Sequence, residues 1–178
     1  MSGRIILLVI AALLLVVVLV WYAWGWLSGP RPVTPQQLGD TAVSAPTPQQ
    51  RAEAAVKLTP MDTPAAIEQM SRVLHESTDP QVKAAMIQGL AVDQDFDSME
   101  AFLAALDDDS LLVRTRAHGA VKRLLQIDAG YRPEAPREQR LEKTKIYREE
   151  WEKMRVSPGL RKFREKLKQQ REKGGGPD

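Results

Sequence analysis

Residues 82–90 read Val-Lys-Ala-Ala-Met-Ile-Gln-Gly-Leu, and residues 113–121 read Val-Arg-Thr-Arg-Ala-His-Gly-Ala-Val. Both stretches place a basic residue after valine and then apolar or small residues at intervals of three or four. A degenerate copy, residues 50–58, precedes the first by a similar spacing. Because this pattern lines one face of a helix, each copy is predicted to be a helix. Recurrence at a near-constant spacing predicts a stack of such units.

A partner helix is predicted before each of the two clear copies. The two partner helices share a helical spacing of apolar residues, which are Ile67, Met70, Val73 and Leu74 in one and Met99, Phe102, Leu103 and Leu106 in the other. Short acidic turns, residues 77–80 and 107–110, join each partner helix to its copy. Carboxylates belong there because they cap the N–H groups that open a helix. Each unit is therefore predicted to be a helix pair.

The repeated helices resemble the HEAT repeat family, in particular its short bacterial units with an Asp-x-x-x-Val-Arg-x-x-Ala-x-x-Ala-Leu core. The residues that follow this core are Asp109, Val113, Arg114, Ala117, Ala120 and Val121. The earlier copy departs from it with Met86 and Gly89, where alanines are usual. The resemblance covers about residues 50–126. It implies an all-α fold, a short α-solenoid over residues 50–128, and a protein-binding scaffold as the general role.

Residues 1–27 are predicted to be a transmembrane anchor. Twenty apolar residues run from Ile5 to Trp24, which as a helix is about 30 Å, the thickness of a bilayer's hydrocarbon core. The far end of this run carries Trp21, Tyr22, Trp24 and Trp26, aromatic residues of the kind that anchor at the headgroup level. A cleaved signal peptide is the competing interpretation. The apolar run is too long for one, and the small residues 42–45 lie well past its end.

The residues on either side of this anchor predict the orientation of the protein in the membrane and a linker to the domain. Arg4 precedes it, and Arg31 is the one basic residue close behind it. A short basic amino terminus usually stays in the cytoplasm, so the domain after Leu27 is expected outside the cytoplasm, on the periplasmic side in a bacterium. Residues 28–49 contain five prolines and are predicted to be an extended linker.

The charge of the chain changes sign along its length. Residues 32–135 contain 9 Lys+Arg and 15 Asp+Glu, a net charge of −6, whereas residues 136–178 contain 14 and 8, a net charge of +6. The two parts are expected either to attract each other or to face different partners.

A closing helix is predicted after the repeats, within residues 129–156. Residues 130–136 break the helical pattern, and an apolar stripe follows that consists of Leu141, Thr144, Tyr147, Trp151 and Met154. A helix with one apolar stripe can cap the last repeat unit. The basic tail, residues 157–178, has Leu160, Phe163 and Leu167 on one helix face, and its end from Gly174 is expected to be disordered.

The residues that could support chemistry do not form a recognisable catalytic or metal site. The chain has no cysteine, which excludes thiol chemistry, disulfides and cysteine-bound zinc. The two histidines, His75 and His118, lack the spacing of a metal site. The alternate acids at 93–97 lack the glycine and distal glutamate of a calcium loop. We therefore expect no enzyme activity, metal or cofactor.

A partner surface is predicted on the second helices. Its candidate residues, expected on the exposed face of those helices, are Lys83, Ile87, Arg114, His118 and Lys122. A structural alternative for Lys83 and Arg114 is that each bonds the turn acid of a neighbouring unit. The expected function is a single-pass, membrane-anchored scaffold that binds an unknown protein. The alternative is a module at the membrane whose basic amphipathic tail binds anionic lipid; nucleic acid is not expected as a partner.

Overall fold

The computed structural model describes residues 15, 17–19, 21 and 33–174. The chain divides into two units, Met1–Val33 and Thr34–Asp178. The described residues of the first unit are helical apart from Val33, and the rest of the predicted anchor over residues 5–26 lies outside the described residues. Within the part of the chain that the structure describes, no helix is both long and apolar enough to cross a bilayer.

The described residues of the second unit form an all-α structure without strands, so the predicted all-α class is confirmed for them. The helices are α2 (Pro35–Ser44), α3 (Pro48–Leu58), α4 (Pro64–Glu76), α5 (Pro80–Val92), the 3₁₀ helix η1 (Phe96–Ser98), α6 (Met99–Ala105), α7 (Leu111–Leu125), α8 (Arg137–Arg155) and α9 (Pro158–Gly174). Helix α9 includes Gly174, where the sequence predicts disorder to begin; residues 175–178 lie outside the described residues.

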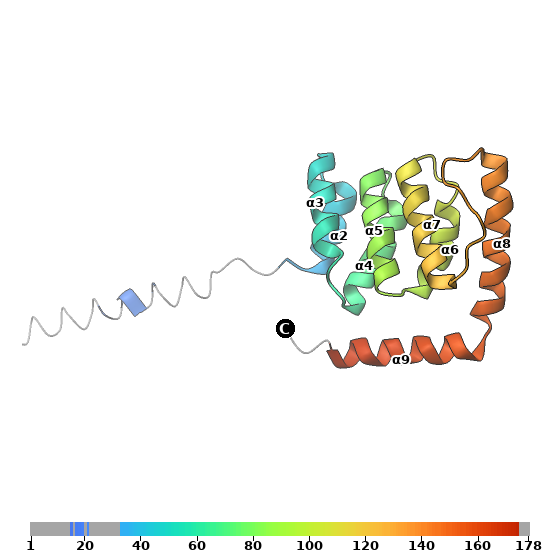
Figure 1. Ribbon diagram of the computed structural model, residues 1–178. Coiled ribbons are helices and arrows are strands. Elements are labelled where there is room, and N and C mark those ends of the chain that lie inside the picture. The colour runs from blue at the N-terminus through green and yellow to red at the C-terminus, as the bar shows by residue number, and fades with distance from the viewer. Residues whose placement is uncertain (1–14, 16, 20, 22–32, 175–178) are drawn as a thin grey trace, which may run out of the picture. The chain divides into compact units, whose positions relative to one another are not determined.

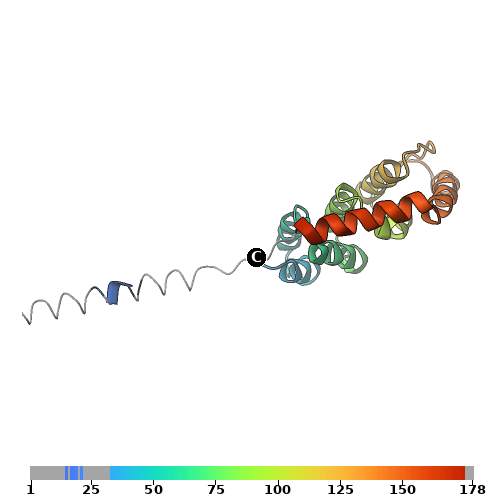
Figure 2. The same ribbon diagram turned by 90° about the horizontal axis from the view of Figure 1, so that it is seen from below.

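The helices of the second unit stack in two layers. Figure 1 shows α3, α5 and α7 side by side, with α2, α4 and α6 behind them. Each helix packs on the next along the chain in the pairs α2–α3, α4–α5 and α6–α7, and α5 packs on both α3 and α7. Helix α8 stands at the far end of the stack, and α9 turns back across its lower edge (Figures 1 and 2).

Four successive helices begin with the same pair of residues, a capping side chain followed by proline. The side chains of Thr34, Thr47, Thr63 and Asp79 accept a hydrogen bond from a backbone N–H of the helix that each opens. A proline follows each of them at the first helical position, where its fixed φ suits the helix and its missing N–H costs nothing. These prolines therefore start helices and do not extend the chain.

The prediction of an extended linker over residues 28–49 is wrong for α2. Thr34 and Gln37 form a capping box, and Leu38 and Ala42 are buried in the same core as the later helices. The proline count concealed this helix because two of the five prolines, Pro35 and Pro48, occupy helix starts. Helix α2 is the partner of the degenerate copy, which becomes α3.

One apolar core runs through the stack from Leu38 in α2 to Leu160 in α9. Leu90 in α5 and Ala117 in α7 are fully buried, as the repeat pattern predicts. Gly89 allows α5 to approach its neighbours closely. A Cβ at this position would lie 2.7 Å from the Met70 sulfur and 3.0 Å from Thr59 Cγ2, so the glycine has a packing role that alanine could not fill without movement.

Helix α8 covers the end of the stack. Its buried aromatic residues pack on the core, and its polar side chains bind carboxylates near the two ends of α6. Tyr147 is fully buried and Trp151 is only 5% exposed. The Trp151 indole N–H donates to Glu100 Oε1 at 2.8 Å. Asp107 lies 2.6 Å from an Arg137 nitrogen and 3.1 Å from an Arg140 nitrogen, and its hydrogen bond with Arg137 is the main cause of a lowered pKa.

Candidate functional site

One member of the partner surface predicted on the second helices, Ile87, is fully buried. Helix α5 lies in the middle of the stack and packs on α3, α4 and α7, so that three neighbours leave it only a narrow exposed strip. That strip includes Gln81, Gln88 and Val92. The prediction that Ile87 points outward is therefore wrong.

The remaining residues of the predicted surface lie in different environments. His118 on α7 is half-buried against Tyr131 and Tyr147, and its Nε2 lies 3.1 Å from the Tyr147 hydroxyl. Burial lowers the His118 pKa, which favours the neutral ring. Lys122 is exposed and lies 2.5 Å from Asp128. Arg114, His118 and Lys122 lie at intervals of four on α7, and all three contact residues within 128–147, whereas Lys83 on α5 pairs with Asp108.

Arg51, Lys83 and Arg114, here called the basic row, occupy the same repeat position in α3, α5 and α7. An Arg51 nitrogen lies 3.2 Å from Asp79, which opens α5, and Lys83 Nζ lies 2.8 Å from Asp108 in the turn before α7. The structural alternative for Lys83, a bond to the turn acid of the next unit, is therefore confirmed.

Arg114 lies on the last helix pair, and residues 126–136, which connect α7 to α8, take the place of a next unit. Its guanidinium donates to the Pro133 carbonyl at 2.7 Å. It also donates to the Asp108 and Asp109 carbonyls of the turn before its own helix, at 2.8 and 2.9 Å. The basic row is therefore structural: each member ties its helix to the next turn or segment.

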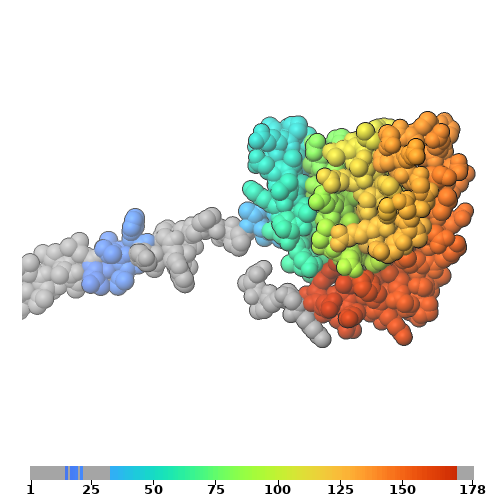
Figure 3. Space-filling view, in the orientation of Figure 1, coloured from blue at the N-terminus to red at the C-terminus, as the bar shows by residue number. Residues whose placement is uncertain are grey.

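Helix α9 is held against the stack by contacts with residues far away in sequence. Its apolar face contributes Leu160, which is buried, and Phe163, whose ring meets Phe96 edge-on at 5.9 Å between centroids. Arg164 forms an ion pair with Asp97. Arg171 donates to the Asp93 carbonyl and lies 3.5 Å from Asp62, so ionic contacts hold the far end of α9. In the space-filling view, α9 lies along the lower edge of the stack (Figure 3).

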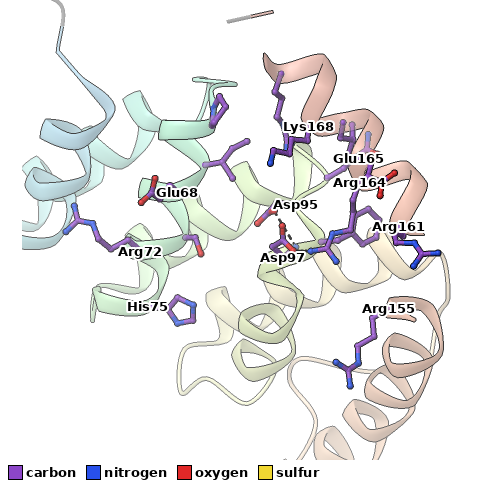
Figure 4. A pocket seen from close by; sticks show the side chains of 17 residues that line it. Glu68, Arg72, His75, Asp95, Asp97, Arg155, Arg161, Arg164, Glu165 and Lys168 are labelled. Atoms are coloured by element: carbon purple, nitrogen blue, oxygen red, sulfur yellow. Dashed lines mark hydrogen bonds and ion pairs between the residues drawn. The ribbon is translucent and has the colours of Figure 1, made fainter. Parts of the chain in front are cut away.

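A groove of about 840 Å³, here called the α4–α9 groove, remains between these two helices. Its lining residues come from α4, from the segment 94–97 and from α9, with Arg155 at the end of α8. Figure 4 shows α4 with Glu68 and His75 on one side and α9 with Arg164 and Lys168 on the other. This volume is within the range of roughly 300–1,000 Å³ that is typical of binding pockets.

The two walls of the groove differ in chemistry. The α4 wall is mixed: Pro64 and Ile67 are apolar, as is Phe96 at the floor, whereas Glu68, Ser71, Arg72 and His75 are polar or charged. The α9 wall is mainly basic, with one acid and one apolar residue among its members: Arg161, Arg164, Glu165, Leu167, Lys168 and Arg171. A ligand in the groove would therefore meet mostly positive charge on the α9 side and mixed apolar and polar surface on the α4 side.

The cations of the groove are not equally available to a ligand. Arg164 and Arg171 hold α9 in place, Arg155 pairs with Glu152, and Arg72 pairs with Asp40 and Glu76. Arg161 and Lys168 form no ion pair with another side chain among the described residues. They are exposed, and they lie two helical turns apart along α9.

Asp93 lies beside the far end of this groove and is poorly stabilised as an anion. Burial is the main cause of a pKa raised to about 6, and the charge of Asp62 adds to it, while Arg171 acts in the opposite direction. One carboxylate oxygen of Asp93 is buried without a hydrogen-bond partner. Among the described residues, here or elsewhere, no three His, Asp or Glu side chains gather as metal ligands would.

The α4–α9 groove was not predicted from the sequence, although the charges of the chain hold one signal for it. The acidic segment 93–97 and the basic tail have opposite charges, and the expected attraction between the middle and the tail of the chain occurs as the Arg164–Asp97 pair. The groove itself depends on where α9 crosses the stack, which no local pattern specifies.

Comparison with known proteins gives no relative from which a function could be transferred. No protein-family model matches the chain, and no curated protein or solved structure matches it either.

Proposed function

We propose that the second unit is a short α-solenoid of HEAT-like helix pairs, and that the protein is a membrane-anchored scaffold which binds a partner protein. The repeated pairs α2–α3, α4–α5 and α6–α7 support the solenoid. So does the basic row, which links successive units through the same repeat position. In such arrays the binding surface is built from several units and not from one loop.

The α4–α9 groove is the observation that carries this proposal. It is open to solvent and combines exposed cations with apolar surface, as expected of a site that recognises a peptide segment. Its walls come from segments that are far apart in sequence but held together by the Arg164–Asp97 pair and by the Phe163–Phe96 contact. A partner segment bound there would contact the repeats and the tail at once.

The alternative function, binding of anionic lipid by an amphipathic tail, has less support. An interfacial helix must present its apolar face to the bilayer. In α9 that face is already used, since Leu160 is buried in the core and Phe163 packs on Phe96. The membrane contact in the proposed function is therefore the predicted anchor, residues 5–26.

The proposal is tested by purifying the full-length protein from membranes and measuring how much partner protein is recovered with it. The measurement is repeated with a variant in which the groove is blocked. Ser71 lines the groove, so Ser71→Trp should fill it and reduce the recovered partner at least fivefold. Gln88→Trp introduces the same tryptophan at an exposed position on α5, outside the groove, and should leave recovery unchanged. Equal recovery with both variants, at unchanged melting temperatures, would contradict binding in the groove.

A further inference from the structure

We infer that the segment bound in the α4–α9 groove is an acidic peptide with an apolar side chain; this inference rests on the proposed function. Arg161 and Lys168 line the groove and have no ion-pair partner among the described side chains. Two exposed cations on one wall, neither of them in an ion pair with a described side chain, favour a ligand that brings carboxylates.

The acids at the floor of the groove do not neutralise these two cations. Asp97 is paired with Arg164, and Asp95 accepts hydrogen bonds from the Ser98 backbone and hydroxyl groups. Glu68 and Glu165 also line the groove, and they lower the net charge of its lining. Residues 158–171 of α9 contain six Lys and Arg and one Glu, so the wall that bears Arg161 and Lys168 is strongly positive, which attracts an acidic segment and repels a basic one.

The apolar part of the groove determines the second feature of the ligand. Ile67 on α4 and Leu167 on α9 are both half-buried and line the groove, and Phe96 is at its floor. An apolar side chain of the ligand placed between them would remove this surface from water. The acids of the ligand would meanwhile face Arg161 and Lys168. This arrangement is an apolar anchor with a polar rim.

A direct binding measurement with synthetic peptides tests the inference. The probe is a fluorescent octapeptide of glutamates with one leucine and one phenylalanine, and its counterpart has lysine in place of each glutamate. The full-length protein in nonionic detergent should bind the acidic peptide, with an affinity that falls as salt is raised, and should not bind the basic one. Equal binding of the two peptides would overturn the inference.

A matched pair of variants separates the groove from the general charge of α9. Arg161→Glu with Lys168→Glu reverses the two unpaired cations of the groove and should weaken binding of the acidic peptide at least tenfold. Lys162→Glu with Lys166→Glu makes the same change in charge on the same helix, at exposed positions that do not line the groove, and should change affinity less than threefold. Equal weakening by both pairs would refute recognition in the groove.

Two further outcomes distinguish this inference from the proposed function. The scaffold function stands and the acidic ligand is wrong if no acidic peptide binds while Ser71→Trp still releases the cellular partner. The basic wall instead faces lipid if soluble short-chain phosphatidylglycerol binds and both double variants weaken that binding equally.

Discussion

Lys83 Nζ in α5 lies 2.8 Å from Asp108 Oδ2 in the turn before α7, which joins two successive helix pairs through partly buried side chains. Arg51 and Asp79 form the same contact one unit earlier, at 3.2 Å. The contact recurs because the basic residue keeps its place in the repeat while an acid lies at the start of the next second helix, as Asp79 does, or just before it, as Asp108 does. It holds adjacent units in register.

Replacing Lys83 should therefore weaken the stack. Lys83→Met keeps the aliphatic part of the side chain and leaves Asp108 without its cation, so the free energy of unfolding should fall by about 1 kcal/mol. Urea denaturation followed by circular dichroism measures this change. Lys145→Met is the control, since Lys145 is exposed and forms no ion pair with the described residues. Equal stability of the two variants would show that the Lys83–Asp108 contact contributes nothing.

Trp151 should be a main contributor to the attachment of α8. It is almost fully buried, stacks on Phe96 at 6.5 Å between centroids, and donates to Glu100. Trp151→Ala should lower the free energy of unfolding by about 3–4 kcal/mol through cavity formation. Trp151→Phe keeps most of the ring and loses the N–H donor, so it should cost about 1 kcal/mol. If Trp151→Ala has the same melting temperature as the wild type, α8 does not cap the stack.

Asp93 should make the second unit more stable at mildly acidic pH than at neutral pH. Because its pKa is about 6 in the folded chain and 3.8 is the ordinary value, the folded state binds the proton more tightly. Stability from this group therefore rises as the pH falls from about 7 through 6 toward 4.

Removing the charge of Asp93 tests that relation. Asp93→Asn should stabilise the protein at pH 7 by about 1 kcal/mol, a value reduced because the carboxyl is partly exposed, and it should have no effect near pH 4. Melting temperatures at the two pH values measure it, with Glu134→Gln at an exposed position as the control. A variant that is destabilised at pH 7 would contradict the unfavourable environment assigned to Asp93.

The repeat units were predictable from the sequence, because helical spacing of apolar residues is a local signal. Leu90 and Ala117 are buried where that spacing places them. Helix α2 was also signalled locally, by the Thr34–Pro35 start and the Gln37 of its capping box, but the density of prolines nearby favoured the extended interpretation.

The exposed face of α5 and the groove were not predictable in the same way. The burial of Ile87 follows from the three helices that surround α5. The sequence carries one signal of it, since apolar residues lie all round the helix over 82–92, but the repeat register favoured an outward position for Ile87. The groove depends on the Arg164–Asp97 and Arg171–Asp62 contacts, whose partners lie far apart along the chain. Such contacts follow from tertiary packing.

The predicted anchor can be tested by extraction and by the mature amino terminus. Full-length protein should stay in the membrane pellet through a carbonate wash and keep its first residues. Cleavage near Ser44 or Ala45, the alternative for a signal peptide, would remove most of α2 and expose the core that Leu38 and Ala42 help to close. A soluble form that starts near Ala45 would nevertheless refute the anchor.

Photo-cross-linking in intact membranes tests the central claim, that the protein is a scaffold which binds its partner in the α4–α9 groove. A benzophenone amino acid placed at Ser71 lies in the groove, and the same residue placed at Gln88 lies on the exposed strip of α5. The account predicts a discrete protein adduct from position 71 in the membrane fraction and none from position 88. An adduct from position 88 with none from position 71 would contradict it.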